Sequence, residues 1–157
     1  MTISNQDYRE IITKAICGRG RKRVQSSDQI KPQQHPSSVL GCWIINHQYE
    51  ATSGGEEKVQ ITGTYDVNIW YSYKENTKTD VVTDKVQYTD EIPLTDVDSQ
   101  SVTSFDEVVA SVIKQPNCIQ CKIGDNGEID VDIEREFMVE VVGETKVQVK
   151  TMMVEDK

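Results

Sequence analysis

A regular alternation of apolar and polar residues from Lys58 to Tyr73 is the clearest pattern in the chain. One parity holds Val59, Ile61, Gly63, Tyr65, Val67, Ile69, Tyr71 and Tyr73. Polar residues occupy the other parity, with Trp70 as the large exception. A period of two over this length predicts a long strand with one buried face. Trp70 then lies on the solvent side, as a rim residue or as part of an interface.

The segments on either side of this strand predict an antiparallel meander. Residues 41–51 alternate, and one parity holds Trp43, Ile45, His47 and Tyr49. Turn-forming residues at 53–55 and 74–77 separate this segment, the long strand and a third, Thr- and Val-rich strand at 79–88 that ends near Pro93.

The C-terminal half repeats this plan. After alternation at 119–123 and a Gly-Asp-Asn-Gly turn, apolar residues recur at Ile129, Val131, Ile133, Phe137, Val139 and Val141. A three-residue loop at 125–127, with Gly127 in the left-handed conformation, matches the apolar faces by setting Ile123 opposite Ile129 and Cys121 opposite Val131.

A second hairpin is predicted at residues 142–144. Its pairing sets Glu140 opposite Lys146 and Glu136 opposite Lys150, so that opposite charges support each other.

Two segments fit more than one structure. Residues 7–18 have apolar side chains at helical spacing and Gly18 as a helix end, but their β-branched run also suits a strand. Residues 104–107 resemble a capping box, whereas Val108, Ala110 and Val112 alternate. For 104–114 we favour a strand that stops at Pro116.

These patterns predict a mainly β fold: an antiparallel β-sandwich or barrel-like domain built from two meanders, with at most one or two short helices. The 157 residues suit one domain. We expect a flexible N-terminal arm at 1–7, a single β-rich domain at 8–153 and a short acidic end at 154–157.

Charge and hydropathy restrict the partners. With 17 Lys and Arg against 26 Asp and Glu, the net charge of −9 argues against nucleic acid. No stretch approaches the roughly 20 apolar residues that span a bilayer, and residues 1–9 do not resemble a secretory signal, so we expect no direct membrane insertion. The basic cluster is interpreted as a solvated segment and kept as an interface candidate: Arg19, Arg21, Lys22 and Arg23.

An acidic ladder occupies one parity of the last long segment: Glu128, Asp130, Asp132, Glu134 and Glu136. Alternate strand residues are too far apart to surround a calcium ion, so we interpret the ladder as a solvated face. Lysines 122, 146 and 150 are expected to neutralise part of it.

Four cysteines are present, at Cys17, Cys42, Cys118 and Cys121. Cys118 and Cys121 have the two-residue gap of metal and redox sites, but three-residue spacing in a strand directs side chains to opposite faces unless a bulge intervenes. We favour free thiols, followed by cross-links between chains, and expect no metal or other cofactor.

Catalytic motifs are not evident. His35 lies in a Gln-Gln-His-Pro loop, and His47 is interpreted as a packed core or rim residue rather than a general base. No phosphate loop or nucleophile elbow occurs, so an enzyme is not expected.

Several motifs, in order along nearly the whole chain, resemble the outer spore coat protein E (CotE) family. They are YREIITKA at 8–15, PSSVLGCWIINH at 36–47, GTYDVNIWYSY at 63–73, NTKT at 76–79, QPNC at 115–118, EREF at 134–137 and VVGETKV at 141–147. The strand VQITGTY at 59–65 is also loosely similar to spore-coat-associated SPOCS domains.

This resemblance implies a structural morphogenetic protein of the bacterial endospore coat. Such a protein gathers on the forespore surface from the mother-cell cytoplasm, self-assembles, and scaffolds other coat proteins of the outer coat. Family members often continue into a long acidic tail, whereas this sequence stops at Lys157, so recruitment through such a tail is not expected.

The strands themselves suggest assembly through sheet edges and the N-terminal arm, locked by thiols. The alternative functions are a fibre-forming or adhesive surface subunit and a small-ligand-binding module.

Overall fold

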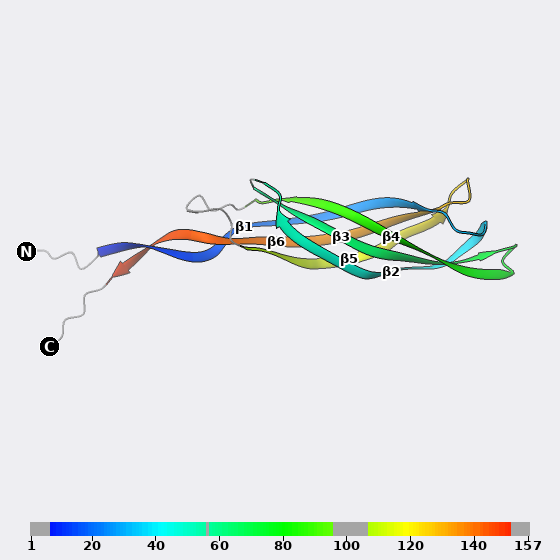
Figure 1. The fold of residues 1–157 in the computed structure, drawn as a ribbon, viewed down its shortest axis with the longest axis horizontal. Coiled ribbons are helices and arrows are strands. Elements are labelled where there is room, and N and C mark those ends of the chain that lie inside the picture. The colour runs from blue at the N-terminus through cyan, green and yellow to red at the C-terminus, as the bar shows by residue number, and fades with distance from the viewer. Residues whose placement is uncertain (1–6, 56, 96–106, 152–157) are drawn as a thin grey trace, which may run out of the picture.

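Two three-stranded antiparallel sheets packed face to face make up the fold in the computed structural model, which describes residues 7–55, 57–95 and 107–151 (Figure 1). Sheet A has the strand order β1-β6-β5 and sheet B the order β2-β3-β4. The strands are β1 Asp7–Ile30, β2 Pro36–Ser53, β3 Lys58–Tyr73, β4 Lys78–Pro93, β5 Glu107–Ile123 and β6 Ile129–Thr151.

The predicted β-sandwich is confirmed, and the sheets do not close into a barrel. The described ranges contain no helix, and therefore none that would cross a bilayer.

Strand β3 has the predicted bounds and provides one half of the core. Its inward residues are fully or almost fully buried, and they face the inward parity of β6, which includes Val131, Ile133, Phe137 and Val139. Burying an aliphatic side chain of this size contributes roughly 1.5–3 kcal/mol. The long alternation thus specifies both the strand and the face on which the second sheet packs.

Sheet B is the predicted meander, but the parity expected for β2 is wrong in its first half. Trp43 and Ile45 point outward, and Cys42 and Ile44 face the core opposite Ile69 and Val67. The register shifts between Ile45 and Gln48, where Asn46 takes a left-handed φ of 55°. Because extra residues are inserted at this bulge, side chains before and after it no longer share one alternation.

The loop predicted at residues 125–127 is confirmed. Ile123 pairs with Ile129 and Cys121 with Val131, and Gly127 has a φ of 78°. Matching the apolar faces of the two strands was therefore sufficient to determine the loop length.

The second hairpin, predicted at residues 142–144, is wrong. Strand β6 runs straight through Gly143, which pairs with Ala15 of β1. Lys146 lies 3.2 Å from Glu10, and the carboxylate of Glu136 lies 2.6 Å from the guanidinium of Arg21. Residues 7–18 are strand rather than helix and pair with residues 141–151 of β6, so the chain does not turn back at Gly143.

Strand β5 confirms the strand favoured for 104–114 over the residues described there, but it does not stop at Pro116. It continues to Ile123 through three register shifts against β6. Proline has no N–H to donate, and an irregular edge strand accommodates it because one side of that strand needs no ladder partner. The bulges therefore join two segments that the sequence pattern separates.

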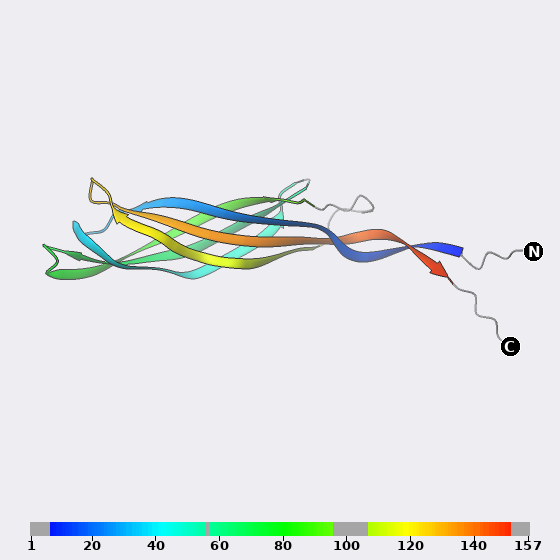
Figure 2. The same ribbon diagram turned by 180° about the vertical axis from the view of Figure 1, so that it is seen from behind.

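The two sheets meet at both sides of the sandwich: β5 lies against β2, and β1 against β4. At one end β1 and β6 continue past the other strands as a two-stranded ribbon (Figure 2). The outermost pair in its register is Asp7 with Thr151. The termini expected at 1–7 and 154–157 lie outside the described residues, apart from Asp7, where β1 begins.

Candidate functional site

The ribbon, defined as residues 7–15 of β1 and 143–151 of β6, is the most unusual surface of the molecule. Among the described residues, the pairing of β5 with β6 reaches Glu107 opposite Val142. Beyond this point β6 has β1 as its single described neighbour. A two-stranded antiparallel pair is only marginally stable in water, so a ribbon of this length is expected to pack against something.

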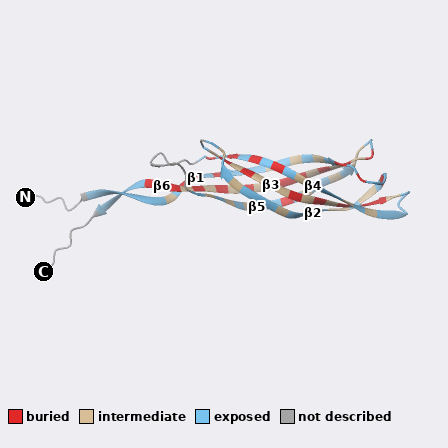
Figure 3. Ribbon diagram, viewed as in Figure 1, coloured by how far each residue is buried: buried red, intermediate tan, exposed pale blue. Residues whose placement is uncertain are grey.

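One face of the ribbon continues the core-facing side of sheet A. On β6 this parity stays buried through Gly143 and Thr145 and becomes exposed at Val147 and Val149. Ile11 pairs with Val147 on the same face. Their exposed fractions are 45% for Ile11, 38% for Val147 and 39% for Val149, and Figure 3 shows the ribbon largely in the colour of exposed residues. Beyond Thr145, the face that is core inside the sandwich is therefore exposed.

A second exposed apolar surface crosses the outer face of sheet B. Trp70 pairs with Gly41 on β2 and with Val81 on β4, and the ring of Trp43 folds over Gly41. Trp43, Trp70 and Val81 are 51%, 41% and 53% exposed. We call these three residues the apolar stripe. The sequence singled out Trp70, whereas the β2 bulge concealed the outward position of Trp43.

The basic cluster and the acidic ladder lie beside each other on the outer face of sheet A. Arg21 is bonded to Glu136 at 2.6 Å, and Arg23 lies 2.7 Å from Glu134. Arg19 lies 3.8 Å from Glu140, and Lys114 of β5 also binds Glu134, at 2.7 Å. Hydrogen bonding to Lys114 lowers the pKa of Glu134 below its usual range.

These pairs reduce the net charge that either group presents to a partner. Lys22 points differently from the three arginines: its ammonium donates to the carbonyl of Glu91 on β4, at 3.0 Å. The sequence did not reveal this neutralisation because the pairing of β1 with β6 joins residues more than a hundred positions apart.

A buried ion pair, not foreseen from the sequence, links the two sheets. Arg135 of β6 points into the core and donates two hydrogen bonds to Asp90 of β4, at 2.7 and 2.6 Å. Its guanidinium lies 4.1 Å from the centre of the Tyr88 ring and also donates to Ser26 at 3.2 Å. Both charged side chains are 4% exposed. This bidentate geometry satisfies charges that burial would otherwise penalise.

His47 is packed as a rim residue between β4 and β5. Its Nδ1 donates to the side-chain oxygen of Gln115 at 3.0 Å, and its Nε2 accepts from the Tyr88 hydroxyl at 2.5 Å. The ring stacks on Tyr49 and Tyr88. Burial lowers the pKa of His47, so the neutral ring is favoured. An imidazole with both nitrogens engaged by protein groups suits packing better than proton transfer.

Three cysteines meet where β2 lies against β5. The Sγ atoms of Cys42, Cys118 and Cys121 all lie within 4.8 Å of one another, and each side chain is half-buried. A bulge at Ile119 brings the last two together, because Cys118 pairs with Ile133 and Cys121 with Val131 on the same inward face. We call these three residues the thiol cluster. The sequence pattern did not decide whether such a bulge exists, and without it Cys118 and Cys121 could not bind one metal ion together.

Protons are unequally held within the thiol cluster. Hydrogen bonding from Cys42 lowers the pKa of the Cys121 thiol below its ordinary value. Hydrogen bonding to Cys121, followed by burial, raises the pKa of Cys42, and burial raises that of Cys118. Cys17 is remote from the cluster: it is fully buried in β1, and its thiol lies 3.4 Å from the carbonyl of Ala15.

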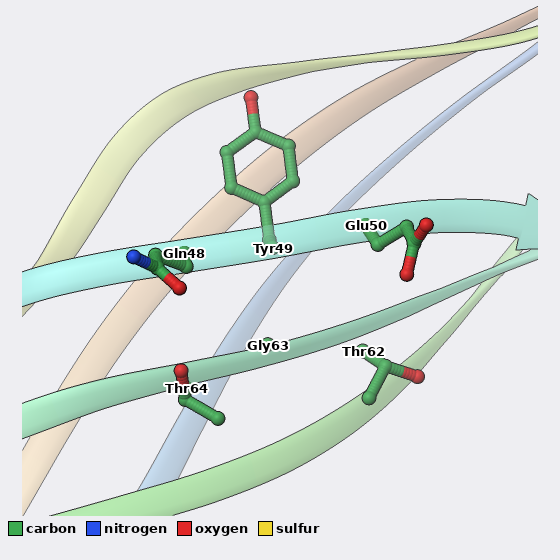
Figure 4. Close-up of a pocket in the computed structure, with 6 residues that line it drawn as sticks. All are labelled: Gln48, Tyr49, Glu50, Thr62, Gly63 and Thr64. Carbon is green, nitrogen blue, oxygen red and sulfur yellow. The ribbon is translucent and has the colours of Figure 1, made fainter.

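A shallow, open hollow of about 330 Å³ lies on sheet B (Figure 4). Its lining residues are Gln48, Tyr49, Glu50, Thr62, Gly63 and Thr64. Tyr49 points away from the two threonines, and Glu50 is the one carboxylate in the lining. A single carboxylate beside hydroxyls, with no second acid or base in the lining, is a poor arrangement for acid–base chemistry.

A sandwich that exposes apolar strands is typical of a protein that works through contacts with other proteins. Residues 7–157 match the model of the outer spore coat protein E (CotE) family, and the chain belongs to that family. It is therefore an outer spore coat protein, and the resemblance seen in its motifs is confirmed. No curated protein and no solved structure matches the chain.

Proposed function

We propose that this chain is a structural, self-assembling protein of the endospore coat, and that the ribbon provides the contact between copies. The observation that carries the proposal is the uncovered apolar face of the ribbon, which includes Ile11, Val147 and Val149. Covering such a face is favourable by roughly 25 cal/mol for each Å² of apolar area that is removed from water. A second copy of the same chain supplies the surface that covers this face.

The apolar stripe is the surface on which we place the neighbouring ribbon. It is exposed, it crosses three strands, and it contains two tryptophans, which are enriched at interaction surfaces. The ribbon and the stripe are different surfaces, so their contact is head-to-tail. Head-to-tail contacts form rings when the rotation closes and filaments when it does not, and both are suited to building a layer.

Two matched substitutions test the role of the ribbon. Val147→Lys places a charge beside Ile11 and Val149, whereas Gln148→Lys places the same charge on the opposite face of the ribbon, at the next residue, which is also exposed. By size-exclusion chromatography with light scattering, we expect large assemblies from the unaltered chain and from Gln148→Lys, and monomers from Val147→Lys. Assemblies of unchanged size in Val147→Lys would refute the role of the ribbon.

A mixing experiment tests the head-to-tail arrangement. Trp70→Lys damages the stripe but leaves the ribbon intact, and Val147→Lys does the reverse. Each variant alone is expected to be monomeric, and an equimolar mixture is expected to give a dimer, because one intact ribbon meets one intact stripe. No dimer in the mixture, with both variants folded by circular dichroism, would contradict this arrangement.

Family membership supports the cellular part of the proposal. The chain gathers on the forespore surface from the mother-cell cytoplasm, and its assembled copies scaffold other proteins of the outer coat. In sporulating cells, immunofluorescence of the untagged chain is expected to show a shell around the forespore, and Val147→Lys is expected to remain diffuse. If both chains form the same shell, localisation to the forespore does not depend on self-assembly through the ribbon.

A further inference from the structure

The thiol cluster has the composition and spacing of a metal site. We infer that Cys42, Cys118 and Cys121 bind one soft, thiophilic cation of the Zn²⁺ or Cu⁺ type. Thiolates select these ions, and a zinc–sulfur bond is about 2.3 Å long. Three sulfurs around one such ion lie about 4 Å apart, so sulfurs within 4.8 Å of one another require only small side-chain movements to close on it.

The backbone is arranged so that all three sulfurs converge. Without the bulge at Ile119, the gap between Cys118 and Cys121 would direct their side chains to opposite faces. Cys42 comes from the other sheet, facing the core opposite Ile69, and reaches the pair because β2 lies against β5. The ligands thus come from two sheets and from distant parts of the sequence.

A disulfide explains the cluster less well. It joins two sulfurs at about 2.05 Å and leaves the third without a function, whereas the three thiols here are mutually close. Each sulfur must lose its thiol proton before it can bond to a metal ion. A bound cation replaces those protons, which pass to solvent as each sulfur bonds to the metal, and no electron is transferred.

A metal ion at this position would cross-link β2 of sheet B to β5 of sheet A. Among the described residues no fourth cysteine, histidine or carboxylate joins the three thiols, so the remaining position on the ion is open to water or to another ligand. The inference does not depend on self-assembly, because it rests on sulfur positions within a single chain.

The test is metal titration of the full, reduced chain without oxygen. Co²⁺ serves as the spectroscopic probe for the zinc-type ion, and Cu⁺ is titrated separately against a coloured chelator. We expect one ion per chain and, with Co²⁺, sulfur-to-metal charge-transfer absorption. Cys42→Ser, Cys118→Ser and Cys121→Ser are each expected to weaken binding at least tenfold, and Cys17→Ser, the matched control outside the cluster, to leave it unchanged.

A second measurement separates metal binding from disulfide formation and from misfolding. Circular dichroism is expected to show the same β-rich spectrum for all four serine variants, and the denatured mass of the metal-loaded chain is expected to show no loss of hydrogen. Uptake of neither ion, uptake that survives replacement of all three cysteines, or rapid loss of two hydrogens in place of metal binding would each overturn the inference.

Discussion

Single residues in the core carry more of the specificity of this fold than its hydrophobic pattern suggests. Arg135 occupies an inward position in an otherwise apolar run of β6, yet Asp90, Ser26 and the Tyr88 ring meet its charge and its hydrogen-bonding groups. A shifted register between the sheets would leave this charge buried and unpaired, at a cost of several kcal/mol. We therefore expect the ion pair to favour this placement of sheet A on sheet B over shifted ones.

Removing one partner of this pair should be far more harmful than removing both. Asp90→Leu leaves the Arg135 guanidinium buried without its counter-ion and is expected to lower the free energy of unfolding by about 3–5 kcal/mol. Adding Arg135→Met should restore most of the loss. Urea unfolding followed by circular dichroism measures both, and a double variant less stable than Asp90→Leu would contradict the explanation.

His47 should make stability depend on pH on the acid side of neutrality. Burial lowers its pKa in the folded chain below the ordinary value of 6.5, and the nearby Arg135 acts in the same direction. The unfolded chain therefore binds the proton more readily, and stability that is complete above about pH 6.5 is lost as the pH falls towards the folded-state value.

The measurement compares urea unfolding of the unaltered chain and of His47→Gln between about pH 5 and pH 7.5. The stability difference between the two should shrink on acidification, because the glutamine does not titrate. A difference that stays constant with pH would exclude a contribution from His47.

Strands and loops differ in how much of them the sequence discloses. The bounds of β3 and the three-residue loop before β6 follow directly from alternation, because a buried face and a tight turn leave few alternatives. The bulges of β2 and β5 leave no comparable trace. Each inserts a residue whose cost depends on the partner strand, and so the outward Trp43 and the converging Cys118 and Cys121 were not predictable.

The partner of β6 was mispredicted for a related reason. Local charge pairing favoured a hairpin at residues 142–144, whereas a strand near the N-terminus supplies the pairing instead. Contacts between residues this distant leave almost no local signal. The ribbon, and with it the candidate assembly surface, therefore becomes visible only in the structure.

The loop before β6 offers a test at this scale. Gly127 has a left-handed φ of 78°, and a side chain there would also meet the ring of His35 at 2.8 Å. Gly127→Ala is expected to lower the free energy of unfolding by about 1–2 kcal/mol. Gly124→Ala, in the same loop but without a left-handed φ, should cost less. Thermal unfolding of both variants checks the order, and equal losses would refute it.

At the scale of the whole molecule, charge and apolar surface act in opposite directions. Copies that each carry a net charge of −9 repel one another, and Arg19, Arg21 and Arg23 of β1 are already engaged with acidic groups of β6. The ribbon and the stripe contribute an attraction that salt does not screen. The balance between these two effects should decide how readily copies associate.

Added salt should therefore strengthen self-assembly. Raising the ionic strength from about 0.05 to 0.5 M screens the repulsion, because the Debye length falls to a few Å, but leaves apolar burial intact. Light scattering at constant protein concentration is expected to increase across this range, and Val147→Lys should scatter as a monomer throughout. Dissolution of the assemblies by salt would instead indicate that charge pairs hold the copies together.

The outermost pair of the ribbon, Asp7 with Thr151, has a practical consequence for engineering. The two strands end side by side, so a bulky group attached at residue 7 or 151 would sit beside the proposed contact surface and obstruct it. A circular permutant avoids this obstruction by joining the termini through a linker and opening the chain at 125–127, at the opposite end of β6. A protein attached to the new ends would be displayed on an assembled layer and would not block the ribbon.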